Sequence, residues 1–371
     1  MKLLHLSDLH LGKRVFELSM LEEQRHMLAQ ALELARQADA TLIAGDIYDR
    51  QVPPAEAVAL FDSFLTRMSE QGSPVLFIAG NHDSAERMAF GSRLMNASGV
   101  YAAPVYDGRA RRVELNDEYG PVHVYLLPFV KPVHVRVALG DERIEGYTAA
   151  LEAAIRAMEV DPEARNVLVA HQFVTGGERS ESEEIMVGGL DNVDAQVFAP
   201  FDYVALGHLH AAQSLCGGRV RYSGAPLPYA FSEAGREKGA LMVTLGPKGE
   251  WDVRPCPFTP LRRMRRLRGT FDELARGEAS EDYIQITLTD EDDIPDAAAR
   301  LTAVYPNLLQ LLYDNARTRA AAADFSRAAL MRREPLELFA ELYEKQNGAP
   351  MDESRRAYLS GVIERIWEGE A

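Results

Sequence analysis

Five short apolar runs in the chain each end in aspartate, asparagine or histidine. In an open α/β sheet, ligands bind just beyond the carboxyl ends of the strands, so we expect these polar side chains to meet in one site. The runs and the residues that follow them are 3–6 before Asp8 and His10, 40–44 before Asp46, 74–79 before Asn81 and His82, 166–170 before His171, and 203–206 before His208 and His210.

The residue types at these strand ends are those that bind divalent metal ions. Imidazole nitrogens and carboxylate or amide oxygens are ligands for manganese, iron or zinc. Asp8 and His10 are two residues apart and share a side, and His208 and His210 repeat that spacing. We interpret Asp46 as the centre of the set, a carboxylate that bridges two metal ions. A site with two metal ions can activate water and stabilise the leaving oxygen of a phosphate ester.

Three further polar residues lie close to the predicted ligands. His82 follows Asn81 directly and cannot easily bind the same ion, so we interpret it as a general acid or a phosphate contact. Asp49 and Asp83 either orient a ligand histidine or cap a turn. The remaining histidines lie outside the strand-end pattern, and we interpret them as core or surface residues: His5, His26, His123 and His134.

The elements that must position these residues alternate between strand and helix over residues 1–130. Helices are predicted at 18–38, 54–68, 84–95 and 145–158, whereas residues 203–253 are predicted to be almost entirely β. Two sheets packed face to face, with helices outside them, would accommodate both patterns. The polar, glycine-rich stretch 176–192 is predicted to be a loop with a solvated acidic face.

The composition describes a packed protein of more than one domain. The chain has 371 residues, 47% of them hydrophobic, which predicts two or three domains. Its two cysteines exclude a disulfide scaffold and a cysteine zinc site, and they fit a reducing cytoplasm. No apolar run is long enough to span a bilayer. A net charge of −16 argues against a general nucleic-acid binder but not against a nuclease whose carboxylates hold cations.

A proline-rich stretch near residue 260 predicts a domain boundary. We expect a catalytic domain over 1–260, a small α/β unit over 261–315, a linker over 316–333 and two amphipathic helices over 334–371. These last helices either dock on a partner or pack on their own domain. An arginine run follows the boundary and either contacts DNA or neutralises nearby acids; its candidate DNA contacts are Arg262, Arg263 and Arg265.

The strand-end motifs resemble the signature of calcineurin-like metallophosphoesterases, and in particular the bacterial DNA-repair nucleases of that family. The resemblance covers residues 1–260 and implies a four-layer α/β/β/α sandwich of two mixed sheets. Beyond residue 260 it implies that the small α/β unit over 261–315 is a capping domain that contacts DNA. It implies that His82 is the catalytic histidine. It also implies two Mn²⁺ ions, although magnesium, iron or zinc would suit the same ligands: one ion held by Asp8, His10, Asp46 and His210, the other by Asp46, Asn81, His171 and His208.

The same resemblance implies partners. Members of this group cut DNA ends and hairpins together with an SMC-like ATPase, to which helices like those of 334–371 bind. They form homodimers, here through the helices near 54–68 and 84–95. One residue departs from the pattern, because eukaryotic and archaeal relatives carry a histidine in place of Asp49. Two alternatives remain. One keeps the metal site but changes the substrate, as a phosphodiesterase acting on small molecules or cyclic nucleotides or as a protein phosphatase; the other is a scaffold protein without activity that regulates an ATPase.

Overall fold

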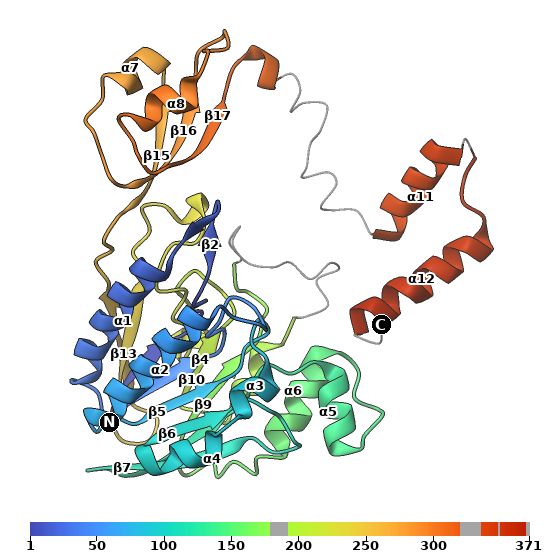
Figure 1. Cartoon of the computed structure of the whole chain (residues 1–371). Helices are drawn as coiled ribbons and strands as arrows, with labels where there is room; N and C mark the ends of the chain where they lie inside the picture. Colours follow the sequence, from blue (N-terminus) through green and yellow to red (C-terminus); the bar gives the residue numbers. More distant parts are fainter. Residues whose placement is uncertain (179–191, 320–334, 348, 369–371) are drawn as a thin grey trace.

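Two six-stranded sheets pack face to face in a computed structural model of the chain (Figure 1). The structure describes all residues except 179–191, 320–334, 348 and 369–371. Strand order in the first sheet is β14-β13-β1-β4-β5-β6, with β1, β4, β5 and β6 parallel. Its strands are β1 (Lys2–Leu6), β4 (Ala40–Ala44), β5 (Val75–Ile78), β6 (Val100–Ala103), β13 (Gly239–Leu245) and β14 (Trp251–Pro257).

The second sheet has the order β11-β12-β10-β9-β8-β7 and is likewise mixed. Strands β8, β9, β10 and β12 are parallel, and β7 and β11 close the edges in the antiparallel direction. Its strands are β7 (Arg111–Asp117), β8 (Gly120–Leu126), β9 (Arg165–His171), β10 (Tyr203–Gly207), β11 (Gln213–Leu215) and β12 (Val220–Tyr222).

Helices cover the outer face of each sheet and complete the predicted four layers. Helices α1 (Leu21–Ala35) and α2 (Ala55–Glu70) pack on the first sheet, and α5 (Pro132–Leu139) and α6 (Gly146–Arg156) on the second. Because strand side chains alternate, Leu4 joins the core beneath the helices, whereas Leu3 joins the core between the sheets. The α/β/β/α sandwich is therefore confirmed.

A third, parallel sheet lies beyond the sandwich. It consists of β15 (Met264–Gly269), β16 (Tyr283–Leu288) and β17 (Leu308–Tyr313), with α7 (Phe271–Ala275) and α8 (Ala297–Thr302) packed on its own apolar core. Buried Glu23 of α1 connects this sheet to the sandwich, because its carboxylate accepts hydrogen bonds from the backbone of Leu261 and Arg262 and from the Tyr283 hydroxyl. Helices α11 (Pro335–Asn347) and α12 (Glu353–Glu368) follow and contact each other.

Some local predictions need correction. The single helix expected over 84–95 is wrong, since Gly91 adopts a left-handed conformation (φ 73°) between α3 (Ala85–Ala89) and α4 (Ser92–Met95). The helix expected from residue 18 begins at Leu21, after a small hairpin of β2 (Arg14–Val15) and β3 (Leu18–Ser19). Helix α5 was not predicted, and β15 corresponds to the arginine-rich run, for which a strand was one of the alternatives considered.

Two sequence predictions lie largely outside the described residues. Most of the acidic loop falls in 179–191, and most of the linker in 320–334; residues 316–319 are helical. Short 3-10 turns complete the described structure: η1 (Asn96–Ser98), η2 (Ala195–Phe198), η3 (Cys216–Gly218) and η4 (Phe231–Glu233). Among the described helices, none combines the length and apolarity needed to cross a bilayer.

A hydrogen-bonded pair joins the two sheets through the core between them. His5 on β1 is fully buried; its Nδ1 lies 2.9 Å from the Tyr203 hydroxyl on β10, and its Nε2 lies 3.2 Å from the Leu206 carbonyl. Burial lowers the pKa of His5 to about 3, so the ring is neutral. Because Nε2–H can only donate to a carbonyl, Nδ1 accepts from the tyrosine hydroxyl.

Tyr203→Phe should therefore leave His5 Nδ1 buried without a donor. We expect the free energy of unfolding, measured by urea denaturation, to fall by about 1–3 kcal/mol. Tyr119→Phe is the matched control, because Tyr119 is 52% exposed and its hydroxyl should contribute little. Equal, small losses in both variants would contradict the role of this pair.

Candidate metal centre and active site

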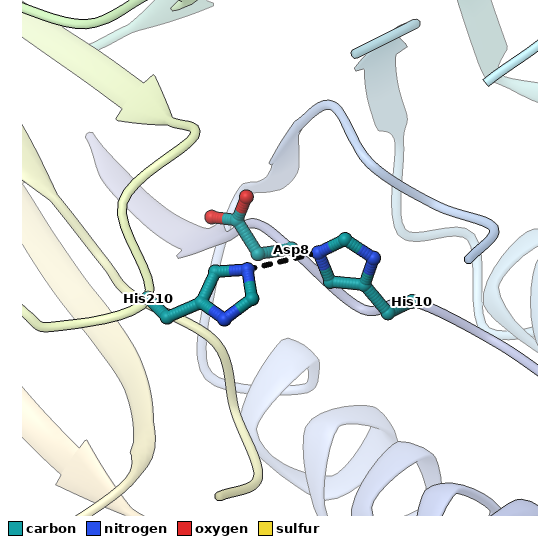
Figure 2. Close-up of side chains that lie close together, drawn as sticks. All are labelled: Asp8, His10 and His210. Carbon is teal, nitrogen blue, oxygen red and sulfur yellow. Dashed lines mark hydrogen bonds between the residues drawn. The ribbon is translucent and has the colours of Figure 1, made fainter. Parts of the chain in front are cut away.

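The predicted ligands from both sheets converge in two groups. In the first group, the Nε2 atoms of His10 and His210 face each other at 3.0 Å, with the Asp8 carboxylate beside them (Figure 2). All three side chains are buried. His10 follows β1 of the first sheet and His210 follows β10 of the second, so this group exists only because the two sheets meet.

The second group surrounds the side-chain oxygen of Asn81. Oδ1 of Asn81 lies 3.0 Å from His171 Nε2 and 3.0 Å from His208 Nδ1. Asn81 follows β5, whereas His171 ends β9 and His208 follows β10. One amide oxygen and two ring nitrogens thus point toward a common position.

Asp46 lies between the two groups. Its Oδ2 atom is 3.4 Å from His171 Nε2 in one group and 3.7 Å from His10 Nε2 in the other. The same carboxylate oxygen therefore faces both groups, which is the placement required of a bridging ligand.

The donor set fits divalent cations. His171 Nδ1 donates to the Ala44 carbonyl at 2.7 Å, so its Nε2 faces the oxygens of Asp46 and Asn81. Burial disfavours a charged ring, but the carboxylates of Asp46 and Asp8 outweigh it and raise the pKa of His171 to about 9. In the metal-free protein a proton thus supplies the positive charge that a metal ion would bring to these oxygens.

Burial has a different effect on His10 and Asp8. It lowers the pKa of His10 well below its ordinary value, which keeps the ring in the neutral form that binds metals. Burial raises the pKa of the Asp8 carboxyl, an effect that the neighbouring His171 and His210 partly offset. A bound cation would favour the ionised carboxylate still further.

Four of the predicted ligands have strained backbones. Positive φ angles are uncommon for residues other than glycine and cost about 1–3 kcal/mol each. Such strain is stable only where the surrounding structure fixes it, and it is typical of functional sites. The ligands with positive φ are Asp8 (52°), His10 (44°), Asp46 (50°) and His208 (101°).

Glycines precede three of the ligands for two different reasons. Gly45 adopts φ 82°, as expected for a tight turn before Asp46. Gly80 and Gly207 instead permit close approach, because a Cβ at Gly80 would overlap the Asp46 carboxylate and one at Gly207 would overlap the Ala44 carbonyl oxygen. The sequence suggested the turn but not this contact between strands.

Asp83 acts as a loop anchor rather than an orienting partner of a histidine. Its carboxylate accepts hydrogen bonds from the backbone N–H groups of Gly80, Ile47 and Tyr48, which joins the loops after β5 and β4. Burial, and then the charge of Asp46, raise its pKa to about 6. Two roles were considered for Asp83, orienting a ligand histidine and capping a turn. Its hydrogen bonds to backbone N–H groups are those of a cap.

His82 lies at the edge of the site. Its backbone N–H donates to Asp46 Oδ1 at 2.9 Å, and its Nδ1 lies 3.1 Å from the Asp49 carbonyl oxygen, to which it donates. Nε2 is then directed toward the site, 4.0 Å from Asp46 Oδ2. The side chain is 16% exposed, compared with 0% for His171, so it is the more accessible of the two histidines.

The arginine candidates lie far along the chain, on or beside β15. Arg262 forms ion pairs with Glu22 and Glu23, and Arg265 pairs with Asp282. Arg263 is exposed. Two of the three candidates thus already neutralise acidic side chains, which is the alternative that the sequence left open.

Three residues beside the centre were not predicted: Lys13, Glu233 and Lys238. Lys13 contacts Asp49, and Lys238 contacts Glu233, which lies 3.7 Å from His210. Glu233 and Lys238 lie between β12 and β13, away from any strand end that carries a ligand, so the strand-end pattern could not reveal them.

Gly80→Ala should displace Asp46 and weaken both metal positions. The added methyl group has no space beside the carboxylate, and such overpacking costs about 1–3 kcal/mol. Titration of the chelator-treated protein with Mn²⁺ should show at least about a tenfold loss of affinity at each position, as expected when ligand support is lost. Gly361→Ala is the control, because its Cβ would meet open space. Unchanged affinity in Gly80→Ala would contradict this account of the centre.

Comparison with known proteins agrees with this geometry. A family model described as calcineurin-like phosphoesterase matches residues 1–212. A second model, SbcD_C, described as type 5 capsule protein repressor C-terminal domain, matches residues 260–347.

A curated relative extends the match over most of the chain. The SbcD subunit of the SbcCD nuclease of Staphylococcus epidermidis (strain ATCC 12228 / FDA PCI 1200) is 31% identical over 321 residues, which cover 84% of this chain and 85% of that protein. The chain therefore belongs to the calcineurin-like phosphoesterase family, and it is a metal-dependent phosphodiester hydrolase similar to the SbcD nuclease subunit.

Proposed function

We propose that this protein is a Mn²⁺-dependent DNA nuclease that cleaves phosphodiester bonds at DNA ends and hairpins. The observation that carries the proposal is the convergence of seven ligand side chains from five strand ends, centred on the Asp46 carboxylate, with His82 at the edge. The similarity to a nuclease subunit over most of the chain directs the proposal to DNA.

The two groups of ligands define which residues would hold each ion. Asp8, His10 and His210 would hold one ion, Asn81, His171 and His208 the other, and Asp46 would contact both. Bound divalent ions would supply an activated water and neutralise charge on the phosphate.

We assign His82 the role of general acid. Its Nδ1–H is engaged by the Asp49 carbonyl, so the proton that moves during catalysis is the one on Nε2. Nε2 lies 4.0 Å from Asp46 Oδ2, and the side chain is 16% exposed, so in the proposed mechanism this nitrogen faces the leaving oxygen of the DNA strand. Protonating that oxygen removes the cost of expelling an alkoxide.

The C-terminal helices are the proposed binding site for a partner protein. The relative's name describes one subunit of a complex, and we propose that α11 and α12 bind an SbcC-type, SMC-like ATPase in the cytoplasm. Phe339 and Leu342 on α11 are about half exposed, and Tyr358 on α12 is 70% exposed. Apolar side chains this accessible favour docking on a partner over a core within the same domain.

We further propose that two copies associate through α2 and the α3–α4 segment. Val58 on α2, Phe90 between α3 and α4, and Leu94 on α4 are large apolar side chains exposed to solvent. Phe90 and Leu94 are more than 80% exposed.

We propose that the β15–β17 sheet forms a cap that contacts DNA, with exposed Arg263 as the candidate contact.

Hydrolysis of two substrates by His82→Gln tests the proposal. One substrate is a 5′-labelled DNA hairpin, whose leaving group needs a proton; the other is bis-p-nitrophenyl phosphate, whose leaving phenolate does not. In Mn²⁺ we expect His82→Gln to lose about 10²–10⁴-fold in kcat on DNA and much less on the small diester. Asp46→Ala should lose both activities, and chelator should abolish wild-type cleavage.

His26→Gln is the matched control, because His26 lies on α1 and donates a hydrogen bond to the Thr259 carbonyl, away from the metal ligands. Equal losses of His82→Gln on both substrates would contradict the general-acid role. Wild-type cleavage of the small diester without any cleavage of DNA, with or without the ATPase partner, would favour a small-molecule phosphodiesterase.

A further inference from the structure

The two histidines of the first ligand group have matching surroundings. Each turns Nε2 toward the other ring and Nδ1 toward a carboxylate. His10 Nδ1 lies 3.7 Å from Asp49 Oδ1, and His210 Nδ1 lies 3.7 Å from Glu233 Oε1. His10 Nδ1 forms no hydrogen bond with the described residues at this distance, so the charge of Asp49 acts on it through space. A negative charge beside Nδ1 favours the proton on that nitrogen and leaves the lone pair of Nε2 free for a metal.

Each of these carboxylates is also paired with a lysine. Lys13 Nζ lies 2.7 Å from Asp49 Oδ1, and Lys238 Nζ lies 2.8 Å from Glu233 Oε2. Glu233 is 1% exposed and Lys238 8%, so this pair is almost completely buried. Without Lys238 the buried Glu233 would be an uncompensated charge, so this pair acts as a unit. Asp49 is less deeply buried, and Arg50 also lies 3.8 Å from its carboxylate.

Further contacts fix both pairs to the ligands. Lys238 donates to the backbone carbonyl of His210 at 2.7 Å, and Glu233 accepts from the Tyr229 backbone N–H at 3.2 Å. Lys13 lies over the Tyr229 ring, which also contacts the rings of His10 and His210 edge to face. The two pairs thus enclose one side of the histidine couple.

The second ligand group is held differently. His171 directs its Nδ1–H to the Ala44 carbonyl, a neutral backbone group that no side-chain substitution removes. The two metal positions therefore differ in what orients their histidines. At the first position, charged side-chain pairs lie beside His10 and His210; at the second, a backbone carbonyl of the first sheet orients His171.

We infer that Lys13–Asp49 and Lys238–Glu233 are positioning pairs that hold His10 and His210 ready for a metal ion, and that they control the affinity of this one position only. The inference rests on the proposed two-metal site. Removal of such orienting partners typically lowers metal affinity about 10–100-fold.

Calorimetric titration of Mn²⁺ into the chelator-treated full chain tests the inference. Wild type should bind two ions. Glu233→Gln and Asp49→Asn keep the side-chain shape and remove the charge, and each should weaken one binding step about 10–100-fold while the other step stays unchanged. Glu237→Gln is the matched control, because Glu237 is exposed on the same segment.

A second readout distinguishes orientation from general damage to the fold. Nitrogen-15 NMR of the metal-free protein should report Nδ1–H rings for His10 and His210 in wild type, and a mixture of tautomers at His210 in Glu233→Gln and at His10 in Asp49→Asn. If Glu233→Gln does not fold, the double variant Glu233→Gln/Lys238→Met carries the test, since it leaves no unpaired buried charge. Its melting temperature and its second binding step should match wild type.

The outcomes separate this inference from the proposed function. Wild-type protein that binds no Mn²⁺ would overturn the proposed function itself. Wild-type protein that binds two ions, with variants that weaken both steps equally or neither, would overturn only the inference.

Discussion

The site depends on how closely the two sheets approach each other at their carboxyl ends. There the Ala44 carbonyl of the first sheet accepts a hydrogen bond from His171 of the second. Gly207 of the second sheet lies so close to the same carbonyl that a Cβ atom at this position would overlap the carbonyl oxygen. The His208 backbone N–H donates to Asp8 across the same boundary at 2.9 Å. Deeper in the core, the hydrogen bond between His5 and Tyr203 also joins the two sheets. These contacts set the separation at which ligands from different sheets can share an ion.

That approach brings histidines of the second sheet beside the buried Asp8 and Asp46 carboxylates of the first. Burial of the Asp8, Asp46 and Asp83 carboxylates costs free energy unless positive or hydrogen-bonding partners are present. Histidines surround Asp46 and hold its pKa well below the ordinary value although burial opposes this, whereas three backbone N–H groups support Asp83. The metal-free centre is thus a compensated cluster of protons and carboxylates. Divalent cations would take over the charge compensation that these protons supply.

The strand-end pattern predicted the gathering of the ligands because this follows from strand direction. The two packed sheets were predicted from the order of strand and helix segments, and the four layers from the family resemblance. A parallel strand must deliver its last residues to the same edge as its neighbours, so Asp46 and Asn81 could be placed without coordinates. The break at Gly91 was missed, because an isolated glycine within a helical stretch does not by itself mark a left-handed break. Glu233 and Lys238 could not be predicted either. They reach His210 through a turn whose path depends on tertiary packing, and nothing in their spacing marks a ligand's partner.

The most direct test of the account is anomalous diffraction at the manganese absorption edge from crystals of the full chain loaded with Mn²⁺. The account predicts two peaks about 3.5–4 Å apart. One should lie among Asp8, His10 and His210, and the other among Asn81, His171 and His208, with Asp46 in contact with both. A single peak, or two peaks that do not share the Asp46 carboxylate, would contradict the central claim that this residue bridges two metal ions.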